Sequence, residues 1–361
     1  MAMNSTPGID ALLAFVCCPT CRGTLRTAPH SPDDIDRLQC TQCGSRWPLR
    51  FGIPDLRAAG VTDPYLSADE DLRAAERLHE RGLTGGFADA LAAYYSTNER
   101  VSADQSRRFI AATLAAEDRS RAVLASWQAR APLAAAGRLT MLDAGCGTGP
   151  LLVAADSPNV QLIGIDVGMR WLVLAAARLR DRGVTAHLAC AGTDHLPLAN
   201  ASCDTVSSES VIENVPSAGA LLSEASRVLR PGGRLWLTTA NRWSMGPDPH
   251  VGMPFGSWLP DRVVSAWARR RGMVPPRRRL LSARALRRLL EERGLRNVHL
   301  EPPPIAEAQI AASSRLLRLA VGGYRATART TLGRAVLSRI GPSLLCVATK
   351  PGVTQPVPTP P

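Results

Sequence analysis

The chain has 361 residues, of which 45% are hydrophobic and 20% charged, as is typical of a folded globular protein. Its length exceeds the usual size of one domain, so we expect two units, one of them small. No stretch approaches the roughly 18 uninterrupted apolar residues of a membrane span, and the apolar run IDALLAFVCC lacks the basic residues that precede a secretory signal core. These features favour a cytoplasmic protein.

The net charge of +12 comes from the last third of the chain. Residues 241–361 hold 20 Arg and Lys residues but 6 Asp and Glu residues. A basic region of this kind indicates an anionic partner, whether RNA, a phosphorylated substrate or a membrane surface. The alternative is a coding bias toward arginine, because Lys350 is the only lysine in the chain.

Four of the nine cysteines have a regular spacing near the start of the chain. Cys18, Cys21, Cys40 and Cys43 read C-x2-C-x18-C-x2-C, which predicts a structural zinc ribbon with four thiolate ligands and no open position. Redox-active pairs or plain buried cysteines are the alternatives. About 60 residues bury little core, so we expect zinc removal to unfold residues 1–60 before the rest of the chain.

The sequence around these cysteines has a counterpart in a known family. LLAFVCCPTCRGTL and LQCTQCGSRWPLRFGIPDL resemble the zinc-ribbon activator protein that partners tRNA, rRNA and release-factor methyltransferases. The likeness covers residues 11–56 and includes both cysteine pairs. Members of that family bind the side of a methyltransferase and stabilise it, so the resemblance implies a methyltransferase in the rest of the chain.

Residues 61–130 are rich in Ala, Arg and Glu and form a predicted helical lead-in. Helical patterns cover 67–82, 86–95 and 104–130, with Gly85 and Gly86 as an interruption. In methyltransferases such a lead-in often packs over the cofactor, and a tyrosine there can reach its methionine carboxylate. Tyr94 and Tyr95 are candidates for that contact, and ordinary packing residues are the alternative.

The stretch LTMLDAGCGTGPLL predicts a buried strand over 139–142, a glycine-rich turn and a helix from Pro150. Its G-x-G-x-G spacing differs from the dinucleotide fingerprint, and it lacks the Lys-Ser/Thr of a P-loop. Asp143, just before the turn, would repel a pyrophosphate but can accept a hydrogen bond from an ammonium group. The expected ligand is therefore an amino acid joined to a nucleoside.

A second predicted strand, VQLIGIDVG, ends in Asp166, which is well placed to bind a ribose diol. With the segments up to ALLSEASRVLRPGGRLWLTTANR, this resembles the class I S-adenosylmethionine-dependent methyltransferases over residues 110–240. The resemblance implies an α/β fold with a Rossmann-like seven-stranded sheet over residues 131–350, and S-adenosylmethionine as cofactor. The implied cofactor-binding residues are Asp143, Gly145, Cys146, Gly147, Gly149, Asp166, Val167, Thr193 and Asp194.

One position departs from the family pattern. Members usually read Gly-Asp-Ala-Glu before Leu-Pro, with the Asp on the adenine amino group, but this chain has Gly192 at the place of the Asp. Adenine recognition then falls to the Thr193 backbone or to Asp194. Weaker cofactor binding and loss of activity are the alternatives.

The acceptor side is less defined by the sequence. In this family the acceptor faces the loops after the fourth and fifth strands, which contain Glu213 and Asn241. No Asn-Pro-Pro-Tyr motif or catalytic Pro-Cys motif is present. His250 lies in an insertion over 242–280 that suits a lid, and it is the residue there able to act as a base near neutral pH. These three are the candidate catalytic residues, whereas we expect His195 to be structural.

A second insertion covers 303–341, before a final strand over 343–350 and a disordered Pro-rich tail over 351–361. Within it, four arginines fall on one side of a predicted helix, at positions 315, 318, 325 and 329. Such a helix can lie on anionic lipid, bind phosphate or be solvated. Peripheral membrane contact is thus one expectation, without a transmembrane segment.

The sequence leaves three interpretations of the function, of which two are enzymatic. The first is a methyltransferase with a small or lipid-linked, possibly anionic, acceptor held under the 242–280 insertion. The second is an RNA methyltransferase that grips RNA through the zinc ribbon and the basic region, as in zinc-ribbon-bearing 23S rRNA guanine methyltransferases. The third is a non-catalytic partner of another enzyme. The sequence does not determine the oligomeric state.

Overall fold

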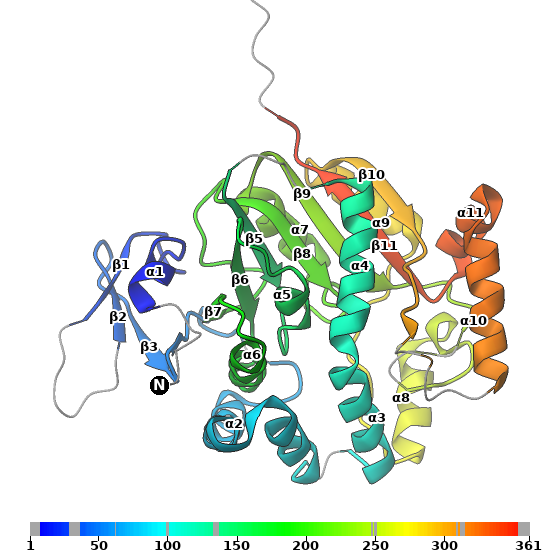
Figure 1. Ribbon diagram of the computed structural model, residues 1–361, viewed down its shortest axis with the longest axis horizontal. Helices are drawn as coiled ribbons and strands as arrows, with labels where there is room; N and C mark the ends of the chain where they lie inside the picture. Colours follow the sequence, from blue (N-terminus) through cyan, green and yellow to red (C-terminus); the bar gives the residue numbers. More distant parts are fainter. Residues whose placement is uncertain are drawn as a thin grey trace, which may run out of the picture.

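A seven-stranded sheet forms the centre of the molecule in a computed structural model, which describes residues 8–28, 37–61, 63–98, 101–132, 137–246, 248, 251–307, 310 and 315–352 (Figure 1). The strand order is β10-β11-β9-β8-β5-β6-β7, and β11 runs antiparallel to both of its neighbours. This arrangement confirms the predicted Rossmann-like fold. The strands are β5 (Leu139–Ala144), β6 (Val160–Asp166), β7 (His187–Cys190), β8 (Cys203–Glu209), β9 (Leu229–Ala240), β10 (Arg296–Glu301) and β11 (Ser343–Thr349).

Helices cover both faces of this sheet, which explains why its central strands are nearly all apolar. All six residues of β5 are buried; Leu142 and Ala144 pack into one hydrophobic cluster and Met141 into the other. The first cluster includes residues of α7 (Ala218–Val228) and α9 (Ala283–Glu292), and the second residues of α5 (Pro150–Ala154) and α6 (Met169–Arg182). The result is a three-layer α/β/α sandwich.

The lead-in consists of α2 (Ala68–Ser96), α3 (Ala103–Leu114) and α4 (Ala116–Arg130). Ser67 and Glu70 form a capping box that starts α2. The glycine pair kinks this helix rather than ending it, because Gly86 has φ of 79° and the next amide, of Phe87, donates to Asp181 at 2.7 Å. α2 then packs along α6, and α4 crosses the sheet face beside α5 (Figure 1).

The N-terminal segment forms a separate four-stranded antiparallel sheet, of order β1-β2-β3-β4, with one short helix. This unit lies beside the β7 edge of the central sheet (Figure 1). There Asp55 pairs in parallel with Cys190, and the Leu56 amide donates to the Cys190 carbonyl at 2.7 Å. The unit comprises α1 (Ile9–Leu13), β1 (Leu25–Thr27), β2 (Arg37–Cys40), β3 (Arg46–Arg50) and β4 (Ile53–Pro54).

The small unit shares its core with the large one. Leu12, Val16, Leu38 and Leu56 are buried in the same hydrophobic cluster as residues of the central sheet such as Leu142. The domain boundaries predicted from the sequence remain predictions. The packing nevertheless shows that apolar contact continues across the expected boundary near residue 60.

The two insertions lie on the flank opposite the N-terminal unit (Figure 1). The first carries η1 (Gly256–Trp258) and α8 (Asp261–Arg270), and the second α10 (Arg315–Ala328) and α11 (Thr331–Ile340). Arg325, one of the four predicted stripe arginines, pairs with Glu307 and donates to the Ile305 carbonyl at 2.7 Å. The predicted tail lies outside the described residues beyond position 352. Across the described ranges, every helix is too short or too polar to cross a bilayer.

Candidate active site and metal centre

A cavity of about 830 Å³ opens at the carboxyl ends of β5, β6 and β8. This is where open α/β sheets bind their ligands, and the volume lies within the usual range for small-molecule sites. Eight of the nine predicted cofactor residues line it; Gly149 is the exception. The eight are Asp143, Gly145, Cys146, Gly147, Asp166, Val167, Thr193 and Asp194.

The glycine turn forms one wall of the cavity, and its backbone explains its composition. Gly145, Gly147 and Gly149 all have positive φ, of 87°, 50° and 74°. A Cβ on Gly145 would collide with the side chain of Val211, so the turn packs directly against the loop after β8. Gly149 is the N-cap of α5, whose first residue is Pro150. Glycine at these three positions therefore allows a backbone path that other residues rarely adopt.

Asp166 fixes the turn to the end of β6. Its Oδ2 accepts from the Gly147 amide and its Oδ1 from the Gly168 amide, each at 2.9 Å. Each carboxylate oxygen has a second acceptor position, so both can still bind hydroxyl groups in the cavity. Burial raises the pKa of Asp166 to about 6, although the two backbone donors oppose that shift. This arrangement suits the predicted contact with a ribose diol.

Asp143 lies at the end of β5 with 2% of its surface exposed. Its Oδ1 accepts from the Ser207 hydroxyl at 3.1 Å. Burial, together with the nearby carboxylates of Glu209 and Asp166, raises the pKa of Asp143 to about 8. The carboxyl groups of Asp143, Asp166 and Glu209 all line the cavity, and together they attract a cationic ligand such as an ammonium group.

Asp194 occupies the space that the side chain missing from Gly192 would fill. A Cβ on Gly192 would lie 2.6 Å from Oδ1 of Asp194 and 2.9 Å from a methyl group of Val61. Gly192, Thr193, Asp194 and Val61 all line the cavity. The carboxylate of Asp194 therefore lies next to the position of the customary Asp, as one of the two sequence-based alternatives requires.

Comparison with known proteins agrees with this geometry. Residues 142–237 match the family model described as methyltransferase domain, and they contain the glycine turn, Asp166 and Asp194. The chain contains a class I S-adenosylmethionine-dependent methyltransferase domain. The seven-stranded sheet is the fold that the resemblance implied for it.

Several relatives match this methyltransferase domain. The ubiquinone/menaquinone biosynthesis C-methyltransferase of Syntrophotalea carbinolica is 41% identical over 105 residues, 28% of this chain and 44% of that protein. The demethylmenaquinone methyltransferase of Lactobacillus johnsonii is 28% identical over 170 residues, 44% of this chain and 68% of that protein. This chain therefore spans less than half the length of the first relative. The solved phosphoethanolamine N-methyltransferase 2 of Haemonchus contortus with S-adenosyl-L-methionine is 18% identical, covers 63% of this chain and 52% of that chain, and has a TM-score of 0.41.

Two of the three candidate catalytic residues, Glu213 and Asn241, do not line the cavity. The carboxylate of Glu213 is buried and accepts from the Thr239 hydroxyl at 2.8 Å and the Ala240 amide at 3.3 Å. Burial also raises its pKa. The amide of Asn241 donates to the carbonyls of Arg339 and Gly341 at 3.0 Å, so it fastens the end of α11 to β9. His250 lies outside the described residues.

Glu209 is a carboxylate of the cavity that the sequence prediction missed. It is the last residue of β8, lines the cavity, and accepts from Arg119 Nε at 2.8 Å and the Ser120 hydroxyl at 2.9 Å. Arg119 also lines the cavity and comes from α4, about 90 residues earlier in the chain. The place of Glu209 at the carboxyl end of a buried strand could have identified it from the sequence. The prediction instead chose Glu213, four residues later.

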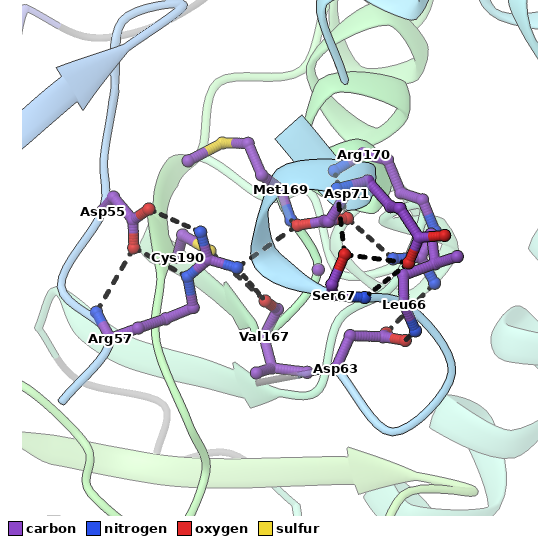
Figure 2. Close-up of polar contacts among 12 residues, drawn as sticks. Asp55, Arg57, Asp63, Leu66, Ser67, Asp71, Val167, Met169, Arg170 and Cys190 are labelled. Carbon is purple, nitrogen blue, oxygen red and sulfur yellow. Dashed lines mark hydrogen bonds and ion pairs between the residues drawn. The ribbon is translucent and has the colours of Figure 1, made fainter. Parts of the chain in front are cut away.

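A buried cation, Arg170, also lines the cavity, and residues of the lead-in hold it. Arg170, the second residue of α6, pairs with Asp71 at 2.7 Å and with Asp63 at 3.0 Å (Figure 2). It also donates to the Tyr94 hydroxyl at 3.2 Å. Arg170, Asp63 and Tyr95 line the cavity, whereas Tyr94 contacts Arg170 from outside it. The contact of Tyr94 or Tyr95 with a cofactor stays a prediction, and the sequence prediction missed the arginine and the carboxylates around this pair.

The same network extends to the end of the N-terminal unit. Arg57 pairs with Asp55 at 2.6 Å and Asp71 at 3.3 Å, and donates to the Val167 carbonyl at 3.3 Å (Figure 2). Asp71 also accepts from the Met169 amide at 2.8 Å, at the start of α6. One fully buried carboxylate therefore joins the N-terminal unit, α2 and the loop after β6.

The four cysteines predicted as metal ligands lie together. Their sulfur atoms are all within 4.8 Å of one another. The Sγ atoms of Cys18 and Cys43 are 3.7 Å apart, and those of Cys21 and Cys40 are 3.4 Å apart. Four thiolates around zinc, each about 2.3 Å from the ion, have sulfur atoms about 3.8 Å apart. The cluster therefore has the donor set and spacing of a closed tetrahedral site.

Proposed function

We propose that this chain transfers the methyl group of S-adenosylmethionine to a small or lipid-linked biosynthetic acceptor. One observation carries the proposal: a single cavity is lined both by the cofactor-type residues of the methyltransferase domain, here called the cofactor wall, and by a second set of side chains, here called the acceptor wall. The second set mixes apolar groups with one ion pair and comprises Tyr65, Ala112, Ala116, Arg119, Glu209, Val215 and Pro216.

At the cofactor wall, we assign the amino acid part of the donor to the glycine turn and Asp143. Asp166 then binds the ribose, and Asp194 binds the adenine amino group in place of the residue missing at Gly192. These roles are supported by the acceptor oxygens of Asp143 and Asp166 at the cavity and by the place of Asp194 beside Gly192.

At the acceptor wall, we assign Glu209 as the base that removes the acidic hydrogen of the acceptor. When bound, S-adenosylmethionine supplies an electrophilic methyl group, so the domain must align the nucleophile and remove its proton. Glu209 lines the cavity at the end of β8, and Arg119 holds its carboxylate in one orientation. Glu213 and Asn241 then support the loops after β8 and β9 from outside the cavity.

The class of acceptor is supported by the relatives. The two named above act, by their names, in ubiquinone or menaquinone biosynthesis or on demethylmenaquinone. Such acceptors have an aromatic or enolic centre whose deprotonation a carboxylate can assist. The apolar groups of the acceptor wall suit a molecule of this kind.

The test is the destination of a labelled methyl group. The full chain is incubated with S-adenosylmethionine labelled in the methyl group and with three fractions of the source cells: organic-soluble lipids, water-soluble small molecules and total RNA. We expect label in the lipid or small-molecule fraction. Label in RNA would favour the RNA methyltransferase interpretation, and a protein that binds no cofactor would favour the non-catalytic one.

The role of Glu209 is tested separately with Glu209→Gln. We expect kcat to fall by about 100-fold or more, with cofactor affinity changed by less than a factor of about three, because the group acts on the acceptor. Glu292→Gln is the matched control, since Glu292 is on the outer side of α9 and pairs with Arg288. An unchanged kcat in Glu209→Gln would return the assignment to Glu213 or His250.

We also propose that the four-cysteine cluster holds zinc with a structural role. All four ligand positions are taken by protein sulfur, which leaves no position for a substrate. Elemental analysis of the purified chain is expected to give one zinc per molecule, and Cys18→Ser/Cys43→Ser is expected to lose it. Iron, or no metal, in the unmodified chain would contradict the proposal.

A further inference from the structure

The flank formed by the two insertions exposes an unusual number of apolar side chains. Of the fourteen large hydrophobic residues exposed in the described ranges, ten lie between positions 243 and 340. Exposed apolar residues scattered singly need no explanation, but a contiguous set indicates an interaction surface.

Six of these residues form a contiguous apolar strip. Its members are Trp243, Met245, Trp258, Leu332, Val336 and Ile340. The rings of Trp243 and Trp258 are 5.7 Å apart, and the Met245 amide donates to the Ile340 carbonyl at 2.9 Å. On α11, Leu332, Val336 and Ile340 are spaced by four residues and therefore share one face. Leu332 is 78% exposed.

Arginines flank the apolar strip. Arg329 precedes Leu332 by three residues, and Arg339 follows Val336 by three; both are exposed. Arg242 lies over the ring of Trp243 at 5.7 Å. The wider region, residues 241–361, holds 20 basic but 6 acidic residues.

We propose that the apolar strip and its arginines bind the surface of an anionic lipid bilayer. Tryptophan rings with an apolar body and one polar edge partition to the membrane interface, and Trp258 keeps its N–H bonded to the Ser244 carbonyl at 2.8 Å. Aliphatic side chains enter the acyl boundary, while arginines attract acidic headgroups.

Other occupants fit the apolar strip less well. Four of its six members are aliphatic or thioether side chains, which offer RNA neither stacking nor hydrogen bonds. A second copy of the same face would bring two strongly basic regions together, which charge repulsion opposes. An acidic bilayer satisfies both the apolar and the cationic groups.

This inference extends the proposed function but does not depend on it. The insertion over 242–280 that supplies three members of the apolar strip also supplies Arg277, which lines the cavity. Membrane contact would therefore bring the cavity near lipid-linked acceptors. Vesicle binding is measured without cofactor or acceptor, so its failure is distinguishable from failure of methyl transfer.

The experiment is co-sedimentation of the full chain with vesicles of phosphatidylcholine alone or mixed with phosphatidylglycerol. We expect binding to the acidic vesicles, and a loss of at least about tenfold in affinity in Trp243→Ser/Leu332→Ser/Val336→Ser, because three side chains leave the interface. Leu83→Ser is the matched control: Leu83 is 63% exposed but lies on α2, and its variant should bind like the unmodified chain.

Arg329→Gln/Arg339→Gln should weaken binding to acidic vesicles most at low ionic strength. The melting temperature and cofactor binding of each variant show that its fold is kept. Equal vesicle binding by the triple variant and the unmodified chain would overturn the proposal. RNA binding without vesicle binding would also overturn it, as would a change in oligomeric state as the sole effect of the triple variant.

Discussion

At the residue scale, the buried carboxyl group of Asp143 serves ligand binding but lowers the stability of the protein without ligand. This carboxyl group is buried, faces the carboxylates of Glu209 and Asp166, and has its pKa raised to about 8. An unfolded aspartate ionises near pH 3.8. Between this pH and about 8, the folded chain therefore retains a proton that the unfolded chain releases. Stability contributed by protonated Asp143 is therefore lost as the pH rises from about 4 to 8.

Asp143→Asn should separate stability from binding. Without cofactor, the variant is expected to melt higher than the unmodified chain at pH 9, and the difference should shrink toward pH 6, because asparagine has no charge to bury. Its affinity for S-adenosylmethionine should fall at least about tenfold, since a charge-assisted hydrogen bond is lost.

Scanning calorimetry and titration calorimetry measure these two effects of Asp143→Asn. Asp156→Asn serves as the control, because Asp156 is exposed and does not line the cavity. Unchanged affinity in Asp143→Asn would show that Asp143 does not contact the cofactor.

Asp194 is the residue that we assign to the adenine amino group. Asp194→Ala should weaken binding of S-adenosylhomocysteine by about tenfold. It should also reduce the preference for this ligand over S-inosylhomocysteine, in which oxygen replaces the amino group. Gly192→Asp should not improve binding, because its Cβ would lie 2.6 Å from Asp194 Oδ1. A preference unchanged in Asp194→Ala would transfer the role to the Thr193 backbone.

At the scale of elements, a buried ion network positions α2 and α6. The carboxylate of Asp71, in the first turn of α2, pairs with Arg57 and Arg170 and accepts a hydrogen bond from the first amide of α6. Ser67 and Glu70 start α2 locally, but the direction of the helix across α6 depends on these long-range bonds. The loop between β6 and α6 is held by the same contacts.

Asp71→Ala should destabilise the chain by about 3–5 kcal/mol, because it leaves two buried guanidinium groups without their shared carboxylate. Asp104→Ala is the matched control: Asp104 is in the first turn of α3, and its partner Arg108 is 67% exposed, so the cost should stay below about 1 kcal/mol. Urea unfolding of both variants provides the comparison. Equal losses in the two variants would mean that the network contributes little to stability.

At the scale of the whole molecule, the N-terminal unit is continuous with the methyltransferase domain. The two share a hydrophobic cluster, and Asp55 and Leu56 pair with Cys190 at the β7 edge. An uncovered strand edge leaves amide and carbonyl groups unpaired, so loss of the unit exposes both apolar surface and backbone. This changes the expectation drawn from the sequence, in which residues 1–60 unfold first.

Metal removal should therefore lower the melting temperature of the whole chain in one transition and weaken cofactor binding, since Arg57 contacts the loop carrying Val167. Calorimetry with and without a chelator tests this. In Cys18→Ser/Cys43→Ser the chelator should have no further effect. Two separate transitions, the first without change in cofactor affinity, would instead show an autonomous ribbon.

The family resemblance carried by the sequence predicted the class of fold, and local chemistry predicted the metal-type cysteine cluster and residues that line the cavity. Cys18, Cys21, Cys40 and Cys43 are recognisable because ligand spacing is local, and Asp143 and Asp166 because each lies near the carboxyl end of a buried strand. Such signals depend on neighbours within a few residues, so they survive without knowledge of packing.

Only the tertiary structure decided which distant side chains share the cavity. Arg119 meets Glu209 across 90 positions, Arg170 meets Asp63 across 107, and Asp194 fills the space beside Gly192. Glu213 carries the same type of side chain as Glu209, but its carboxylate accepts a hydrogen bond from Thr239 instead. Sequence gives the chemistry of a side chain and the strand that carries it, whereas its direction and partners depend on how helices from other parts of the chain pack against that strand.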